Sequence, residues 1–177
     1  MIARERYSPG PAHGAEIQKK DGATWGLILT RELRHGPEMV WEALTDPAQL
    51  SQWAPFDSDT NLGAAGATVK LTTMGAPKLL VTETTVTRAE APKLLVYDWG
   101  GNEMRWELEP LGKGTRLTLW TSINRHFIAM GASGWHICFD VLDRHLGGEP
   151  IGRITGPAAM QVEGWKRLLE EYTERFR

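Results

Sequence analysis

The chain has 177 residues, a hydrophobic fraction of 41% and a formal net charge of −2, values typical of one globular domain with a sizeable core. This near-neutral charge provides no basic field for nucleic acid or an anionic membrane, so neither is expected as a partner. The single cysteine, Cys138, excludes an intrachain disulfide and, with no readable signal peptide or membrane span, favours a cytoplasmic location.

The first part of the chain predicts an arm followed by a hairpin. Residues 1–14 are polar and rich in proline and glycine, which favours a flexible arm ahead of a single domain at 15–177. The stretches 15–20 and 25–33 flank Asp21-Gly22, a turn signal for a β-hairpin. At a spacing of two along one face of this hairpin stand Leu27, Leu29 and Leu33.

Two short helices are predicted between residues 37 and 53. Pro37 suits the first position of a helix because its missing N–H would have no partner there. Asp46-Pro47 ends the first helix and begins the second, with Asp46 as the cap and Gln49 three residues later, as in a capping box. The apolar positions of the two helices are Met39, Val40, Trp41, Leu44, Leu50 and Trp53.

The middle of the chain predicts a meander of antiparallel strands. The expected strands are 67–74, 78–88, 94–99, 103–109 and 115–123. The alternation of apolar and charged residues is clearest in 103–109, where Met104, Trp106 and Leu108 face one way and charged residues face the other. This pattern is typical of a sheet with one buried and one solvent-exposed face. Trp120 falls on the opposite face from Leu119, which makes it a surface aromatic or a contact in a homodimer.

The last third of the chain has helical spacing. Ser133 is expected to cap a helix that runs to Leu146, and a final amphipathic helix is expected from Pro157. The apolar stripe of the first helix contains Trp135, Cys138, Phe139, Leu142 and Leu146. Its narrower polar face carries His136 and Asp140.

Several of these segments resemble one known family. The pattern V-W-x-A-L-T-D-P-x-x-L-x-x-W at 40–53 closely resembles the entry helices of the START-like (SRPBCC) superfamily, and most of all the family related to the activator of the heat-shock chaperone ATPase. The strands at 94–99 and 114–119 and the Gly134-Trp135 pair resemble further markers of that family. The resemblance implies an α+β, START-like helix-grip fold, in which a curved antiparallel sheet wraps around a long C-terminal helical segment with two short entry helices. A cavity often lies between sheet and helix in such proteins.

The expected registers bring a set of apolar side chains together between the sheet and the helix. A mainly apolar lining is typical of a small-molecule site, whereas the same side chains can also fill a solid core. The first hypothesis is therefore a protein that binds a small hydrophobic or aromatic molecule. The candidate ligand-binding residues are Trp99, Met104, Trp106, Leu117, Leu119, Thr121, Trp135, Phe139 and Leu142.

Two other functions remain open. An enzyme of the polyketide cyclase or hydrolase type, known in this superfamily, needs a titratable group inside the cavity. A protein-interaction module related to the chaperone activators would use an exposed aromatic patch such as one at Trp120. The chain has no room for the additional N-terminal domain that helps the eukaryotic activators engage the chaperone, so chaperone regulation is not the first expectation.

Catalytic signals are weak. His136 and Asp140 stand four apart on one helix face, which fits either a proton shuttle, half a metal site or a solvated pair. The solvated pair is favoured because no third ligand or nucleophile has a matching spacing. His126 is expected in a surface loop. The sequence therefore predicts no catalytic residue, no metal site and no cofactor.

Overall fold

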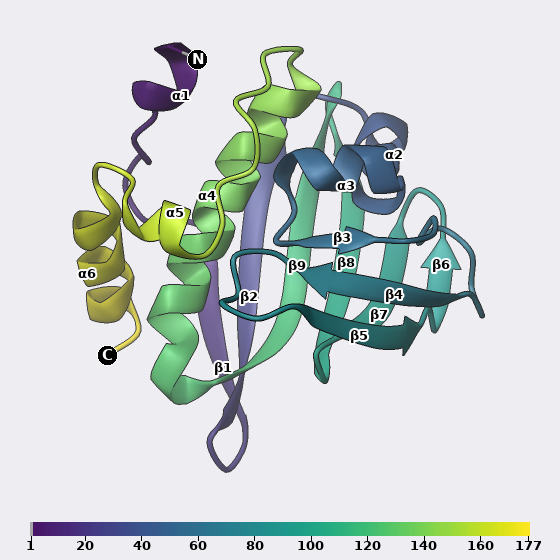
Figure 1. Cartoon of the computed structure of the whole chain (residues 1–177), viewed down its shortest axis with the longest axis horizontal. Helices are drawn as coiled ribbons and strands as arrows, with labels where there is room; N and C mark the ends of the chain where they lie inside the picture. The colour runs from purple at the N-terminus through teal and green to yellow at the C-terminus, as the bar shows by residue number, and fades with distance from the viewer. Residues whose placement is uncertain (1) are drawn as a thin grey trace.

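The computed structural model describes residues 2–177, and Figure 1 shows them as a curved antiparallel sheet crossed by a long helix. The main sheet has six strands, which are, in spatial order, β1 (Ala15–Asp21), β2 (Thr24–Leu33), β9 (Gly114–Asn124), β8 (Asn102–Leu111), β7 (Leu94–Trp99) and β6 (Arg88–Glu90). A smaller sheet contains β3 (Phe56–Ser58), β4 (Thr68–Thr73) and β5 (Leu80–Thr85). The α+β helix-grip fold is confirmed.

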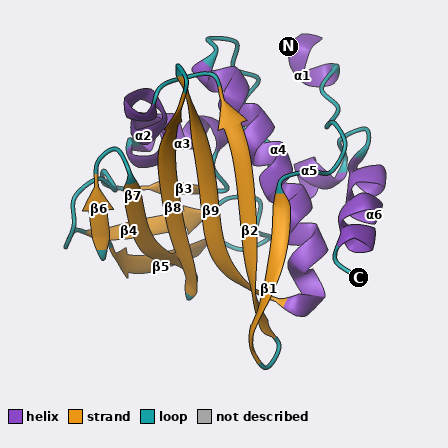
Figure 2. Ribbon diagram, turned by 180° about the vertical axis from the view of Figure 1, so that it is seen from behind, coloured by secondary structure: helices purple, strands orange, loops and turns teal. Residues whose placement is uncertain are grey.

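The helices gather on one side of the main sheet. They are α1 (Ile2–Glu5), α2 (Pro37–Thr45), α3 (Pro47–Trp53), the 3₁₀ turn η1 (Arg125–Phe127), α4 (Ile128–Leu146), α5 (Pro157–Met160) and α6 (Trp165–Arg175). Figures 1 and 2 show α4 and the smaller sheet on the same side of the main sheet, with α6 beyond α4. Within the described residues, no helix has the length and apolar character that a membrane crossing requires.

The predicted hairpin and entry helices are confirmed. β1 pairs with β2 so that Ala15 lies opposite Leu29, and the turn uses Gly22 with a positive φ of 57°. The side chain of Asp46 accepts a hydrogen bond from the Gln49 backbone N–H at 3.1 Å, which caps α3 as expected.

The predicted strand 78–88 is wrong as a single element. Its first part, β5, pairs with β4 in the smaller sheet, and its last residue begins β6 in the main sheet. The chain changes its partner strand between two adjacent residues, because the Val86 N–H donates to the Ala67 carbonyl while the Thr87 N–H donates to the Val96 carbonyl. Alternation along the sequence shows which side chains share a face, but it does not show that a strand changes partners.

The C-terminal helices also differ from the expectation. α4 begins at Ile128, five residues before the predicted cap, and Ser133 lies inside it with its hydroxyl donating to the Ala129 carbonyl at 2.8 Å. The final helix is divided into α5 and α6. The second piece starts after Gly164, which adopts a left-handed conformation with a φ of 94°.

Residues 4–14, which belong to the expected flexible arm at 1–14, pack against the rest of the protein. Tyr7 is only 5% exposed and belongs to the hydrophobic core cluster. Arg4 Nη1 donates to the carbonyls of Ile151, Gly152 and Arg153, each at 3.0 Å. Residues 4–14 therefore contact the C-terminal part of the chain, and proline and glycine content did not indicate those contacts.

Candidate functional site

A pocket of about 270 Å³ lies where α4 meets the ends of β7 and β9. Trp99 and Ile123 contribute from the two strands, and the segment between α4 and α5 forms the outer side. From α4 come Gly131, Gly134, Trp135 and Cys138; from the outer segment come Ile154, Thr155 and Gly156; Pro55 and Ala159 complete the lining. It thus occupies one end of the space between sheet and helix.

Two glycines on α4 shape this pocket in different ways. A Cβ at Gly131 would lie 2.5 Å from Ile123 Cδ1, so the glycine leaves room for the end of the Ile123 side chain. A Cβ at Gly134 would meet nothing within 4 Å. The space that a side chain would occupy at Gly134 is therefore part of the pocket.

The aromatic side of the pocket is formed by two tryptophans held in a fixed orientation. The rings of Trp99 and Trp135 meet edge to face, with centroids 6.1 Å apart and an interplanar angle of 82°. Trp99 Nε1 donates to Thr73 Oγ1 at 3.0 Å, and this bond ties the ring to the smaller sheet.

In addition to its hydrogen bonds with Arg4, the outer segment is fastened to α3 and the smaller sheet at two points. Gly156 and Gly75 touch backbone to backbone, since a Cβ on Gly75 would lie 2.8 Å from Gly156 Cα. Arg153 Nη2 donates to Asp57 Oδ1 at 2.7 Å and to the Leu50 carbonyl at 3.1 Å. These contacts hold the outer side of the pocket against α3 and the smaller sheet.

The pocket is electrically neutral. None of the described residues in its lining has an acidic or basic side chain. Cys138 is the one lining residue with an ionisable group, and burial raises the pKa of its thiol to about 12, so the thiol stays protonated near neutral pH. A small uncharged molecule suits such a site better than an ion.

Of the nine candidate ligand-binding residues, Trp99 and Trp135 line this pocket. The other seven are buried in the core: Met104, Trp106, Leu117, Leu119, Thr121, Phe139 and Leu142. Trp106 shows why, because its ring packs against Trp53, Trp135 and Phe139 at centroid distances of 6.0, 5.7 and 6.2 Å. Their part in ligand binding stays a prediction, and in the structure they fill the interior.

Sequence reasoning missed most of the lining. Gly131 and Gly134 carried a usable signal, because two glycines inside a predicted helix mark close approach or missing volume. Ile154 and Thr155 carried none, because they belong to a linker whose path the sequence pattern does not specify.

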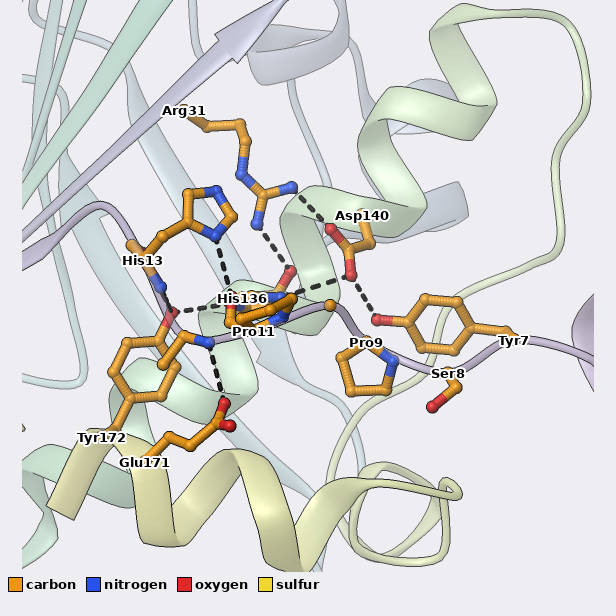
Figure 3. Close-up of polar contacts among 12 residues, drawn as sticks. Tyr7, Ser8, Pro9, Pro11, His13, Arg31, His136, Asp140, Glu171 and Tyr172 are labelled. Carbon is orange, nitrogen blue, oxygen red and sulfur yellow. Dashed lines mark hydrogen bonds and ion pairs between the residues drawn. The ribbon is translucent and has the colours of Figure 1, made fainter. Parts of the chain in front are cut away.

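A polar cluster, shown in Figure 3, connects α4 with β2, α6 and the N-terminal arm. The expectation that His136 and Asp140 form a solvated pair is wrong, because His136 is only 2% exposed. His136 Nδ1 is hydrogen-bonded to the Tyr172 hydroxyl at 2.7 Å, and its Nε2 lies 3.6 Å from Asp140 Oδ2. Arg31 and Tyr7 both donate to the Asp140 carboxylate, at 2.6 and 2.5 Å.

This cluster joins segments rather than exposing a reactive group. Burial lowers the pKa of His136 to about 4, and this effect outweighs the opposing influence of Asp140. The ring is therefore neutral near pH 7 and enclosed by the arm and α6. Its partners come from β2, α4, α6 and the N-terminal arm, so the cluster fastens the last helix and the arm to α4.

Comparison with known families gives a match over residues 34–147, which runs from before α2 to the end of α4. The matching description is "Activator of Hsp90 ATPase homolog 1-like protein". The chain belongs to this family. No curated protein matches the chain.

Solved structures similar to this member of the Hsp90 ATPase activator homolog 1-like family share its fold. A conserved protein of unknown function from Enterococcus faecalis, EF2215, is 17% identical, with a TM-score of 0.67 over 91% of this chain and 89% of its own. CalU16 from Micromonospora echinospora is 20% identical, with a TM-score of 0.63 over 92% and 94%. DynU16, described as a putative protein in the dynemicin biosynthetic locus, is 23% identical, with a TM-score of 0.61 over 71% of this chain and 48% of its own. These likenesses confirm the START-like architecture.

The family match divides the pocket into two parts. It includes the α4 residues and the two tryptophans, but it ends before Ile154, Thr155 and the rest of the outer segment. The arm and α6, which cover the polar cluster, also lie outside it. The inner side of the pocket thus belongs to the family domain, while its outer side is formed by chain that the match does not include.

Proposed function

We propose that this protein binds a small hydrophobic or aromatic molecule in the pocket between the sheet and α4. The observation that carries the proposal is the space at Gly134, open beside the edge-to-face pair of Trp99 and Trp135. A concave, mainly apolar site with few polar groups is the usual form of a small-molecule site. Affinity would come chiefly from burying apolar surface, at about 25 cal/mol per Å² before ordering costs.

Binding is favoured over catalysis by the chemistry of the lining. An enzyme of the cyclase or hydrolase type needs a group in the pocket that exchanges protons near neutral pH. Cys138 stays protonated there, and His136 is turned to the other side of α4. A cytoplasmic location and a dimer through the surface at Trp120, which is 37% exposed, stay predictions.

The test is native mass spectrometry of the purified protein, followed by identification of any molecule released on denaturation. Gly134→Leu places a side chain in the open space and should abolish occupancy without removing any lining group. Met130→Leu adds the same residue at an exposed position of α4 outside the lining and should leave occupancy unchanged.

Binding of defined probes tests the proposal when a bound molecule is lost during purification. Indane and 1-indanone, two small ring compounds, are titrated by isothermal calorimetry against the same three proteins. Saturable binding that Gly134→Leu removes and Met130→Leu keeps supports the proposal. Binding that is equal in all three proteins, or absent from the unmodified protein throughout, contradicts it.

A further inference from the structure

The indole N–H groups around the pocket have unequal hydrogen bonding. Trp53 Nε1 donates to the Ala43 carbonyl, and Trp106 Nε1 donates to the Tyr97 hydroxyl, at 2.9 and 3.0 Å. Trp99 Nε1 donates to Thr73. Trp135, which packs among these rings, donates to none of the described residues, although a buried indole N–H normally has an acceptor.

The unpartnered N–H of Trp135 is not fully enclosed. Among the described residues, the fully enclosed side-chain atoms without a partner are Thr82 Oγ1 and Arg153 Nε. Trp135 Nε1 is not one of them, so it keeps accessible surface even though the residue as a whole is only 7% exposed. Trp135 lines the apolar pocket, so a ligand bound there is the group best placed to use this donor.

A second polar group borders the same space. Thr155 lies on the outer segment, is partly buried, and its hydroxyl forms no hydrogen bond with the described residues. A hydroxyl can both donate and accept, whereas an indole N–H can only donate. Apart from the weakly donating Cys138 thiol and the Trp99 indole, which donates to Thr73, the polar side chains of the described lining are thus the Trp135 indole and the Thr155 hydroxyl, and no charged side chain is present among them to compensate an ionised ligand.

We propose that the ligand is an uncharged ring compound bearing a hydrogen-bond acceptor such as a carbonyl oxygen, and that Trp135 Nε1–H and the Thr155 hydroxyl recognise this acceptor. This inference rests on the proposed binding function and specifies its ligand class. The ring replaces water in the apolar part beside Gly134, and the acceptor satisfies an N–H that is otherwise left without a protein partner. An ionised group is disfavoured because no described side chain in the lining neutralises it.

The test compares molecules with the same skeleton. Indane, 1-indanone and indane-1-carboxylate are titrated against the protein at pH 7.5. One added hydrogen bond should make 1-indanone bind about fivefold tighter than indane, and the carboxylate should bind more weakly than either. Trp135→Phe keeps an aromatic ring and removes the N–H, so it should bring the two neutral compounds to within about twofold of each other. Trp165→Phe, a buried tryptophan of α6 outside the pocket, is the matched control and should retain the preference.

Each outcome distinguishes this inference from the function on which it rests. Equal binding of indane and 1-indanone to the unmodified protein overturns the acceptor proposal while leaving the binding function in place. A ketone preference that persists in Trp135→Phe overturns the assignment to Trp135. If that variant melts early, Thr155→Val supplies the second measurement, with a reduced ketone preference expected and an unchanged one contradicting the proposal. If none of the probes binds, the proposed binding function itself is contradicted.

Discussion

His136 on α4 and Tyr172 on α6 share a buried hydrogen bond of 2.7 Å between Nδ1 and the phenol oxygen. This bond connects the two helices at a point that the N-terminal arm also reaches, because the Tyr172 hydroxyl donates to the His13 carbonyl at 3.1 Å. The contact makes the packing of α6 and the arm sensitive to the charge on His136.

Stability should therefore fall in mild acid. The folded-state pKa of His136 is about 4, below the ordinary value of 6.5, so the unfolded chain binds the proton first as pH decreases. The neutral ring's contribution is complete above about pH 6.5 and is lost progressively as pH falls towards 4, by roughly 2 kcal/mol at pH 5. Urea unfolding at pH 7.5 and at pH 5 measures this loss in the free energy of unfolding. His136→Gln should show a smaller difference in that free energy between the two pH values. An equal difference in both proteins would assign the acid sensitivity to other groups.

Tyr7→Phe should loosen the arm. The substitution keeps the ring, which lies 5.6 Å from the Arg144 guanidinium, but removes the hydroxyl that donates to Asp140 Oδ2. Loss of a partly buried hydrogen bond to a carboxylate should lower the free energy of unfolding by about 1–3 kcal/mol and speed amide exchange between residues 8 and 13. Ser8→Ala removes a neighbouring hydroxyl from an exposed bond and should change stability by less than about 0.5 kcal/mol. Similar effects of the two variants would refute a special role for the Tyr7–Asp140 contact.

The sequence predicts the parts of the fold that depend on local pattern. The buried face of β8 follows from alternation at Met104, Trp106 and Leu108, and the start of α3 follows from Asp46. The environment of His136 does not follow, because a helical pattern shows which face is polar but not what covers it. Here the cover comes from His13 and Tyr172, segments far from α4 in the sequence.

The difference between local sequence pattern and three-dimensional packing also explains which of the candidate site residues line the pocket. Strand registers identify Trp99 and Trp106 as core-facing, and both are at least partly buried in contact with the core. Whether the volume between facing side chains is filled depends on packing in three dimensions, so the pattern does not separate Trp99, which lines the pocket, from Trp106, which does not. The missing side chain at Gly134 was the sequence signal for open space.

Replacing the α4 glycines with alanine should stabilise the protein to different extents. Gly134→Ala adds a methyl group that meets nothing within 4 Å, so the gain in helix propensity should raise the free energy of unfolding by about 0.5–1 kcal/mol. In Gly131→Ala the added Cβ would lie 2.5 Å from Ile123 Cδ1, so the end of the Ile123 side chain must move aside, and the net gain in stability should be smaller than in Gly134→Ala. Urea unfolding of both variants measures the difference. Equal stabilisation would mean that the Ile123 side chain moves aside without a measurable cost.

Trp106→Ala should act on the fold rather than directly on the ligand. The side chain is 1% exposed, packs against Trp135, and donates to the Tyr97 hydroxyl, so its removal leaves both a cavity and a buried phenol without its partner. Large-to-small changes of this kind cost about 3–5 kcal/mol, whereas Trp120→Ala, at a surface position, should cost less than about 1 kcal/mol. Calorimetric titration of 1-indanone at a temperature where Trp106→Ala stays folded tests for direct contact. Affinity within about threefold of the unmodified protein is expected, because Trp106 reaches the pocket only through Trp135; a loss as complete as that expected for Gly134→Leu would place Trp106 in the site itself.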